Sequence, residues 1–502
     1  MMNVVINSIK KQFFNNEFMW IYFIGILLFT LIVFYLNGFN FSKIKLLLIT
    51  ITIIIGSILI YYSSKSKKEI HKIAFLYLLI FGLIIAFTTP IFIVADETEH
   101  FARSDLTSEG ILIPEYTPNK GYYMNNYFWD MLYKCGSTAL NTNFTHTGIR
   151  DAQGYFESVF SQNLFYAYIA QAIGILFAKL LNLSMIWTLW LGRIFNLILY
   201  SSIASFAIKK ANKYKYTLLF LSCLPLAVFQ ASSMSADAFI FAMGILNISY
   251  FIRMYSSENN INKKDLSIFI ISGLLMGLLK IPYIFILLLI FILPKDKFES
   301  KKICNIFYFV SIVLIGVTML YTLKYSSHQL LNSGRLAYIM QNNISTSNQI
   351  NYMLHKPLDV ALTFIVSIGG SFYTVFIQEL SFYHLHYVNG QYLFNIILFI
   401  VFFIVALSSP IKFEKKERIY LLLIFLVMYI STFLTQYLSW TPIGYDSILG
   451  IQARYFIPIL AFIPLIIGRD YYKQIDNYKN IILMLVPLVL TGMIILTMIN
   501  FY

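Results

Sequence analysis

The chain has 502 residues, of which 59% are hydrophobic and only 12% are charged. Soluble domains carry roughly 25% charged residues, and many apolar runs here reach about 18 residues, the length needed to span a bilayer. This composition excludes a soluble globular protein and predicts an all-α polytopic membrane protein. The formal net charge of +14 indicates basic loops on the inner face and contacts with membrane lipids, with no nucleic acid as partner.

The N-terminal segment, residues 1–72, is predicted to form a transmembrane hairpin. Its first apolar run, 18–36, contains no charged residue and no small-residue cleavage site follows it, which is typical of an uncleaved signal-anchor. Lys10 and Lys11 precede this run and favour a cytoplasmic start. A second span at about 45–62 returns the chain to the cytoplasmic side.

A third apolar run, 73–94, then leads outward, so Asp96 is expected to emerge on the exoplasmic side. The segment of about 95–185 contains nine acidic and five basic residues, which suits an exoplasmic loop, and it is too long for a simple connector. Within it, 164–181 is apolar. If both this stretch and 186–208 crossed the membrane, the lysine cluster that follows would lie outside. We therefore expect 164–181 to lie along the outer leaflet or to dip into it.

The membrane core is expected to cover residues 73–470, and 471–502 to form a last transmembrane helix. Two further exoplasmic loops are expected at about 324–359 and 439–454. Together with the N-terminal hairpin, the apolar runs predict roughly 12 to 14 spans.

Two later segments are less regular. The short apolar runs 268–279 and 283–293 have basic flanks, which predicts a hairpin of short spans with Lys280 at its outer tip. Residues 360–377 are ambiguous. A crossing there would place the basic loop at 412–418 outside, so a re-entrant segment is the alternative.

Three carboxylates, a histidine and an arginine crowd the point where the third apolar run ends. Asp96 and His100 are four residues apart and Arg103 is three further, so on a helix they share one face. The cluster could be a salt-bridged helix start at the membrane surface. Alternatively, a low-dielectric boundary can tune a carboxylate for general-base work, which makes Asp96, Glu97 and His100 the catalytic candidates. Asp96 and His100 could also hold a divalent metal, although two ligands alone do not define a site.

Four other charged residues, and Arg103, are candidates for substrate binding. Arg193 lies inside an apolar run, where charge is costly, and either binds a ligand or snorkels to the interface. Asp237 follows small residues and could instead cap a helix. Lys280 and Arg454 mark outer ends of spans, either as interfacial anchors or as phosphate-binding groups. Cations and carboxylates on one face predict a site for a lipid-linked phosphate substrate.

Around Asp96 the sequence resembles the P-D-E-x-x-H-F signature of bacterial membrane proteins known as a domain of unknown function, DUF2142. The residues that carry the likeness are Asp96-Glu97-Thr98-Glu99-His100-Phe101, Arg103 and Glu109-Gly110. Further blocks fit in the expected order at 191–196, 224–226, 230–238 and 451–458, so the resemblance covers about 73–470. The chain departs from the family pattern at Val94-Ala95, where proline usually stands, at Thr98 and at Ala453.

That family is similar in plan to the membrane-embedded C-type glycosyltransferases (GT-C), which take sugar from a polyprenyl-phosphate carrier. The resemblance implies a GT-C-like bundle in the cell membrane, with its active site facing the exoplasmic side and 164–181 as a juxtamembrane helix. It implies Asp96 as the base or acceptor-orienting carboxylate, with Glu97 next. The donor would be a polyprenyl-phosphate sugar and the acceptor a cell-surface glycan or glycopolymer. No nucleotide cofactor is implied, and a metal is left open. The alternatives are a transporter or flippase for lipid-linked envelope glycans and a non-catalytic subunit.

Overall fold

The computed structural model describes residues 16–40, 42–65, 69–118, 120–140, 154–158, 160, 163–258, 260–331, 336–375, 379–380, 388–471 and 478–502. Lys10 and Lys11, which predict the cytoplasmic start, lie outside these ranges, as do residues 141–153 of the first long loop. The described chain is an all-α bundle with one two-stranded sheet, which confirms the predicted class. Long apolar runs become helical in a membrane because no water is present to hydrogen-bond their backbone polar groups, and a helix satisfies these groups within the segment.

Eight helices in the described part of the chain are long and apolar enough to cross a membrane. They are α2 (Glu17–Leu36), α3 (Lys43–Lys65), α4 (Ile70–Thr88), α8 (Ile186–Lys210), α11 (Asp237–Tyr255), α13 (Lys301–Leu331), α18 (Lys415–Ser439) and α21 (Tyr478–Phe501). A ninth span would be the pair Asn212–Ser222 and Pro225–Ala231, bent by 72°. It consists of η2 (Asn212–Tyr214), α9 (Lys215–Ser222) and α10 (Pro225–Ala231).

Shorter apolar helices accompany these spans. They are Phe165–Leu180, η3 (Ile281–Ile292), α16 (Pro357–Tyr373) and α17 (Gln391–Leu407). The predicted total of roughly 12 to 14 spans is reached only if shorter segments of this kind cross the membrane as well.

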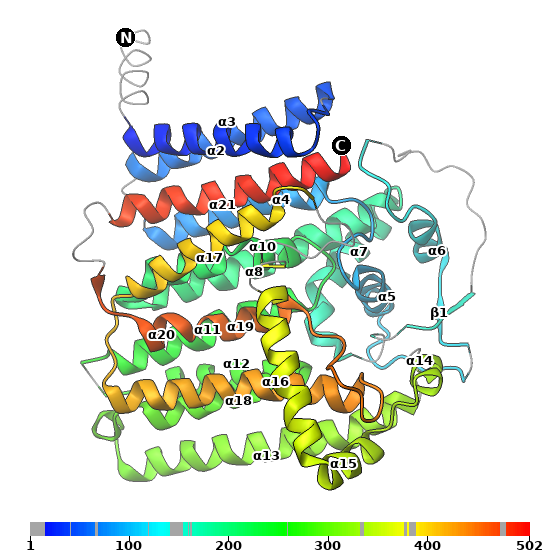
Figure 1. Ribbon diagram of the computed structural model, residues 1–502, viewed down its shortest axis with the longest axis vertical. Coiled ribbons are helices and arrows are strands. Elements are labelled where there is room, and N and C mark those ends of the chain that lie inside the picture. The colour runs from blue at the N-terminus through cyan, green and yellow to red at the C-terminus, as the bar shows by residue number, and fades with distance from the viewer. Residues whose placement is uncertain are drawn as a thin grey trace.

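The N-terminal hairpin, α2 and α3, packs against the last helix, α21 (Figure 1). The Tyr22 hydroxyl of α2 hydrogen-bonds Thr491 of α21 at 2.9 Å. In α4, the Tyr77 hydroxyl contacts Ser63 of α3 at 2.6 Å and donates to the Leu483 carbonyl of α21 at 3.0 Å. The two ends of the sequence therefore form one layer along one side of the bundle.

Short elements of the first long loop gather at one end of the bundle (Figure 1). They are α5 (Glu97–Ser108), β1 (Tyr122–Met124), α6 (Asn126–Tyr133), β2 (Gly154–Phe156), η1 (Phe165–Tyr168) and α7 (Ile169–Leu180), and β1 pairs with β2 antiparallel. Lys179 of α7 contacts the Asp105 carboxylate of α5 at 2.7 Å, which holds the two helices together. The Phe165–Leu180 segment is shorter than the spanning helices, and the expectation that 164–181 does not cross stays a prediction.

The predicted short hairpin is present. α12 (Lys263–Leu279) leads into η3, and Lys280 lies at the turn between them. The two halves pack so closely that a β-carbon on Gly277 would lie 2.7 Å from the Ile284 β-carbon. Small residues allow this approach between helices.

The region expected to form an exoplasmic loop at 324–359 contains helices in its described part, and its side of the membrane stays a prediction. α13 continues to Leu331, and α14 (Leu336–Gln341) and α15 (Thr346–His355) follow. α16 then runs across the direction of the long helices (Figure 1). It exposes apolar side chains, among them Leu358 and Ile365, which suits a helix that lies in a lipid interface. Residues 376–377 of the ambiguous segment lie outside the described residues.

The predicted loop at 439–454 connects α18 to a series of short helices. These are η6 (Ala453–Phe456), α19 (Ile457–Leu460) and α20 (Ile463–Ile467). Earlier in the chain, η4 (Lys295–Lys297) precedes α13. The loop after α18 is thus what presents Arg454 to the bundle end that carries α5.

Candidate functional site

Asp96 lies immediately before α5, in the short connection that follows α4. Its backbone has φ 62°, in the left-handed region that aspartate tolerates better than most residues. The Asp96 carbonyl accepts the His100 N–H at 3.0 Å and so begins the helix. Its carboxylate makes no capping bond to α5. It pairs instead with Arg454, which comes from the opposite part of the sequence.

Asp96, Asp237, Lys280 and Arg454 form one contiguous cluster, which we call the charged quartet. Arg454 pairs with Asp96 through Nη2, donates from Nη1 to the Ala95 carbonyl at 3.2 Å, and lies with Nε 3.4 Å from Asp237 Oδ2. Lys280 Nζ contacts the other Asp237 oxygen, Oδ1, at 2.6 Å. Two carboxylates and two cations therefore alternate from Asp96 to Lys280.

The quartet is closed at its middle and open at its two ends. The side chains of Arg454 and Asp237 are only 2% and 3% exposed, whereas those of Asp96 and Lys280 are 33% and 32% exposed. Lys280 Nζ also lies 4.4 Å from the centre of the Tyr455 ring, a favourable cation–π distance. A ligand can thus reach a carboxylate at one end and an ammonium at the other.

The charges of the quartet support one another. Burial would raise the pKa of the Asp96 carboxyl, but the neighbouring Arg454 holds that pKa below its usual value. Burial would lower the pKa of Arg454, but Asp237 and Asp96 raise it above the ordinary value for arginine. Both groups are therefore ionised at neutral pH.

Glu97, next to Asp96, belongs to a different contact. All five N–H groups of Arg193 are used: two donate to the Glu97 carboxylate, at 2.8 and 2.6 Å. The other three donate to the carbonyls of Ala86, Thr89 and Pro90 at 2.8–2.9 Å. Glu97 also accepts the backbone N–H of Met234 at 3.0 Å. The side chains of Arg193 and Glu97 are 0% exposed, so we correct their expected roles in phosphate binding and catalysis to a structural one.

Arg103 is likewise fully buried and bonded within the protein. It donates to the Asn163 carbonyl at 2.8 Å, to Thr107 Oγ1 at 2.7 Å and to the Leu112 carbonyl at 2.8 Å. These bonds join α5 to the chain before η1 and after α5. The expected role in substrate binding is therefore replaced by one in holding the loop.

His100 lies beside the quartet, where Arg454, Asp237 and Asp96 influence it electrostatically. Its ring stacks on Phe160 at 4.9 Å, and Nδ1 hydrogen-bonds the Tyr168 hydroxyl at 2.9 Å. Burial, followed by the charge of Arg454, lowers the pKa of His100 to about 4, so the ring is neutral at pH 7. Among the described residues, no group of three or more His, Cys, Asp and Glu side chains could hold a metal ion.

Glu379 is a neighbour that sequence reasoning missed. Its carboxylate accepts the Ala453 N–H at 3.1 Å, next to Arg454, and the residue is 5% exposed. Burial raises the pKa of Glu379 to about 7, against the opposing effects of that hydrogen bond and of Arg454. It is the only acidic residue between Asp359 and Glu414, and an isolated carboxylate in apolar sequence was the available signal.

The fold and the quartet define a class of protein: a polytopic membrane protein with a partly open charged site at one end of its bundle. The chain belongs to the family described as "Predicted membrane protein (DUF2142)", whose model matches residues 79–463. This confirms the resemblance seen in the sequence, and the match contains all four residues of the quartet. Searches of curated proteins and of solved structures gave no match. The similarity to C-type glycosyltransferases stays a prediction.

Proposed function

We propose that the protein is an integral-membrane glycosyltransferase that moves a sugar from a polyprenyl-phosphate carrier to a cell-surface glycan or glycopolymer. The observation that carries the proposal is the charged quartet. A phosphate fits the partly exposed ammonium of Lys280, with the buried guanidinium of Arg454 adding positive charge behind it, while the partly exposed carboxylate of Asp96 is available to a hydroxyl group. Donor and acceptor chemistry are thus supported within one cluster.

The exoplasmic orientation belongs to the same proposal. α8 carries Arg193 near the quartet and ends at Lys209 and Lys210, about 24 Å further along the helix axis. Basic residues follow at that far end, in η2 and at the start of α9. The positive-inside rule favours this basic end as cytoplasmic, and so favours the quartet end as exoplasmic.

In the proposed reaction the acceptor hydroxyl oxygen forms a bond to the anomeric carbon of the donor sugar. The bond between that carbon and the phosphate oxygen breaks, and its electron pair leaves with the polyprenyl phosphate. Lys280 and Arg454 stabilise the charge on the departing phosphate. Asp96 orients the hydroxyl and takes its proton as the new bond forms. Attack opposite the leaving group inverts the anomeric centre.

Two observations favour an enzyme over a transporter or a subunit without catalysis. The quartet lies at one end of the bundle, whereas a transport path places polar groups near the middle of the membrane. Furthermore, Asp96 is ionised and partly exposed beside Arg454, an arrangement that suits group transfer better than a purely structural contact.

The test is sugar transfer by the full chain in liposomes that contain radiolabelled polyprenyl-phosphate sugars and a glycan acceptor. Wild-type protein is compared with Asp96→Asn and with Asp446→Asn, a matched loss of one carboxylate at an exposed loop position. We expect transfer by the wild type and the control and its loss in Asp96→Asn. Equal turnover by all three removes Asp96 from the base role. Flipping of the lipid without transfer supports the transporter.

A further inference from the structure

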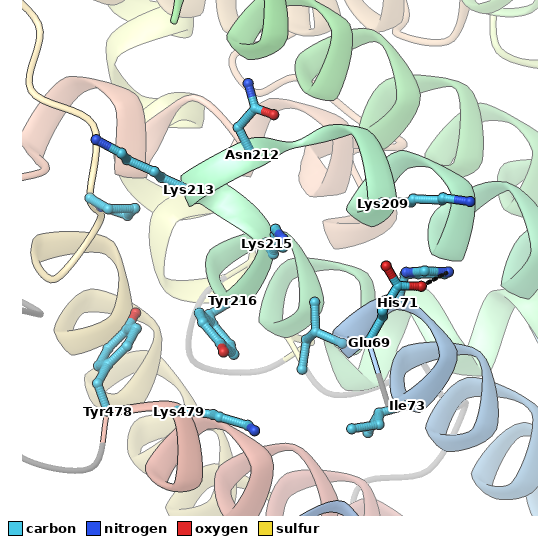
Figure 2. Close-up of a pocket in the computed structure, with 12 residues that line it drawn as sticks. Glu69, His71, Ile73, Lys209, Asn212, Lys213, Lys215, Tyr216, Tyr478 and Lys479 are labelled. Carbon is cyan, nitrogen blue, oxygen red and sulfur yellow. Dashed lines mark ion pairs between the residues drawn. The ribbon is translucent and has the colours of Figure 1, made fainter. Parts of the chain in front are cut away.

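A second charged feature lies at the far end of α8 from the quartet. There, the ends of α4, α8, α9 and α21 enclose an open cavity of about 620 Å³ (Figure 2). Lys209, Lys213, Lys215 and Lys479 line it, each from near the end of its helix. The cavity is separate from the proposed active site, since α8 rises about 24 Å between Arg193 and Lys209.

Among the described residues, the lysines that line this cavity outnumber its carboxylates. The one acidic residue in the lining, Glu69, already lies 3.7 Å from His71 and 3.5 Å from Lys72. Figure 2 shows Glu69 and His71 together at the edge of the cavity. Among the described residues, no carboxylate forms an ion pair with any of the four lysines.

The rest of the lining is apolar or aromatic. Ile70, Ile73 and Pro410 contribute to it, and the rings of Tyr216 and Tyr478 meet edge to face at 6.1 Å. Lysine ammonium groups act as point charges that bind phosphate without a fixed geometry. A cavity with a lysine rim and an apolar wall, at the ends of membrane-spanning helices, matches a ligand that carries phosphate at the membrane surface.

We propose that this cavity is a binding site for a phosphate-bearing anion, supplied either by the headgroup of an anionic phospholipid or by a soluble polyphosphate. Two cations from different helices, Lys215 of α9 and Lys479 of α21, hold the phosphate. The ligand would thereby link α21, which lies outside the family match at 79–463, to α9, which lies within it.

The competing explanation is that these lysines only mark the inner face, as the positive-inside rule requires. A matched control separates the two. Lys301 and Lys302 are exposed at the start of α13 and do not line the cavity. They lie on the same face, because the loop before α13 contacts the loop after α11 through the 2.7 Å bond from the Ile261 N–H to the Lys297 carbonyl.

The experiment compares the wild-type full chain with Lys215→Gln/Lys479→Gln and with Lys301→Gln/Lys302→Gln. Native mass spectrometry measures phosphatidylglycerol retained from nanodiscs of equal parts phosphatidylcholine and phosphatidylglycerol. Calorimetry in neutral detergent measures binding of pyrophosphate. Each of the two cavity lysines makes one ion pair with the bound phosphate, worth about fivefold in affinity, so the cavity variant should bind about 25-fold more weakly. The control should bind like the wild type.

The outcomes separate the sources and the explanations. Selective loss of phosphatidylglycerol in the cavity variant identifies a lipid headgroup, and selective loss of pyrophosphate binding identifies a soluble anion. Equal loss in the control variant, or no difference among the three proteins in either arm, overturns the proposal. Thermal unfolding of each variant checks its fold, and the single variant Lys215→Gln, expected to bind about fivefold more weakly, replaces the double variant if that one is unstable.

Discussion

Asp96 and Glu97 are neighbours in the sequence, yet each meets its own arginine in a different environment. Glu97 and Arg193 are enclosed, and every N–H of the arginine has an acceptor within the protein. Asp96 and Arg454 lie at an edge where the carboxylate keeps one third of its surface exposed. One pair therefore has nothing left to offer a ligand, and the other does.

The difference also concerns what each pair joins. Arg193 and Glu97 connect α8 and α5 to the last turn of α4 and, through Met234, to the turn before α11. They fix the frame from which Asp96 extends. A rigid support of this kind keeps the charged groups of a neighbouring site in place while a substrate binds and reacts. The comparison teaches that one short motif supplies both the support and the candidate chemistry.

The largest expected effect comes from breaking the enclosed pair. Arg193→Leu leaves the Glu97 carboxylate buried without its partner, which should destabilise the protein by about 3–5 kcal/mol. The measurement is the free energy of unfolding in detergent, compared with Arg469→Leu, a matched change at an exposed arginine. Stability close to wild type in Arg193→Leu would contradict the structural role.

In contrast, a change in the partly exposed pair of Asp96 and Arg454 should lower turnover more than stability. Asp96→Asn preserves shape and leaves Asp237 beside the buried Arg454, so the unfolding free energy should fall by less than the roughly 3 kcal/mol expected at minimum for Arg193→Leu. Turnover in the liposome assay should fall about 100-fold or more, because a positioned base is lost. Unfolding and transfer are measured on the same preparation. A large loss of stability in Asp96→Asn would show that both pairs are structural.

The sequence predicts the helices and the residues of both ion pairs, but it does not predict which carboxylate pairs with which arginine. The apolar runs predict the helices, the charge pattern predicts that Phe165–Leu180 does not cross, and the basic flanks predict the hairpin with Lys280 at its turn. Local spacing cannot tell which carboxylate meets which arginine. Asp96 reaches Arg454 across 358 positions, and Glu97 reaches Arg193 across 96.

Two further misses have related causes. Arg193 is predicted to be functional because a charge in an apolar run is costly. In the structure, backbone carbonyls at the end of α4 that lack a helical partner accept its N–H groups. Glu379 lies next to Arg454 only through the backbone of Ala453, a contact that no sequence pattern encodes. Burial and long-range pairing, rather than residue type, therefore distinguish the structural charged residues from the candidates for catalysis or binding.

Lys280, the partly exposed cation at the other end of the quartet from Asp96, tests whether the quartet binds phosphate. Lys280→Gln removes a charge-assisted contact to the donor phosphate, worth about 1.5–3 kcal/mol, so the KM for the lipid-linked sugar should rise about tenfold or more. Lys280→Arg should retain most of the affinity because it keeps the charge. The control is Lys356→Gln, an exposed lysine between α15 and α16. An unchanged KM in Lys280→Gln would place the phosphate elsewhere.

The last expected effect is confined to a range of pH and concerns Glu379, which is buried like Glu97 but has no arginine bonded to its carboxylate among the described residues. Its pKa is raised from 4.5 to about 7 in the folded protein, so the folded state binds this proton more tightly than the unfolded chain does. The stability contributed by the protonated carboxyl is fully present below pH 4.5 and is lost as the pH rises through 7. Glu379→Gln should remove this dependence.

The measurement is the difference in unfolding free energy between Glu379→Gln and wild type, followed with pH. This difference should shift in favour of the variant as the pH rises from 4.5 to 7, by at most about 3 kcal/mol. Glu258→Gln, at an exposed position, should show no such shift. A flat difference for Glu379→Gln would mean that the carboxylate is ionised and stabilised by Arg454, and that the quartet extends to a fifth charge.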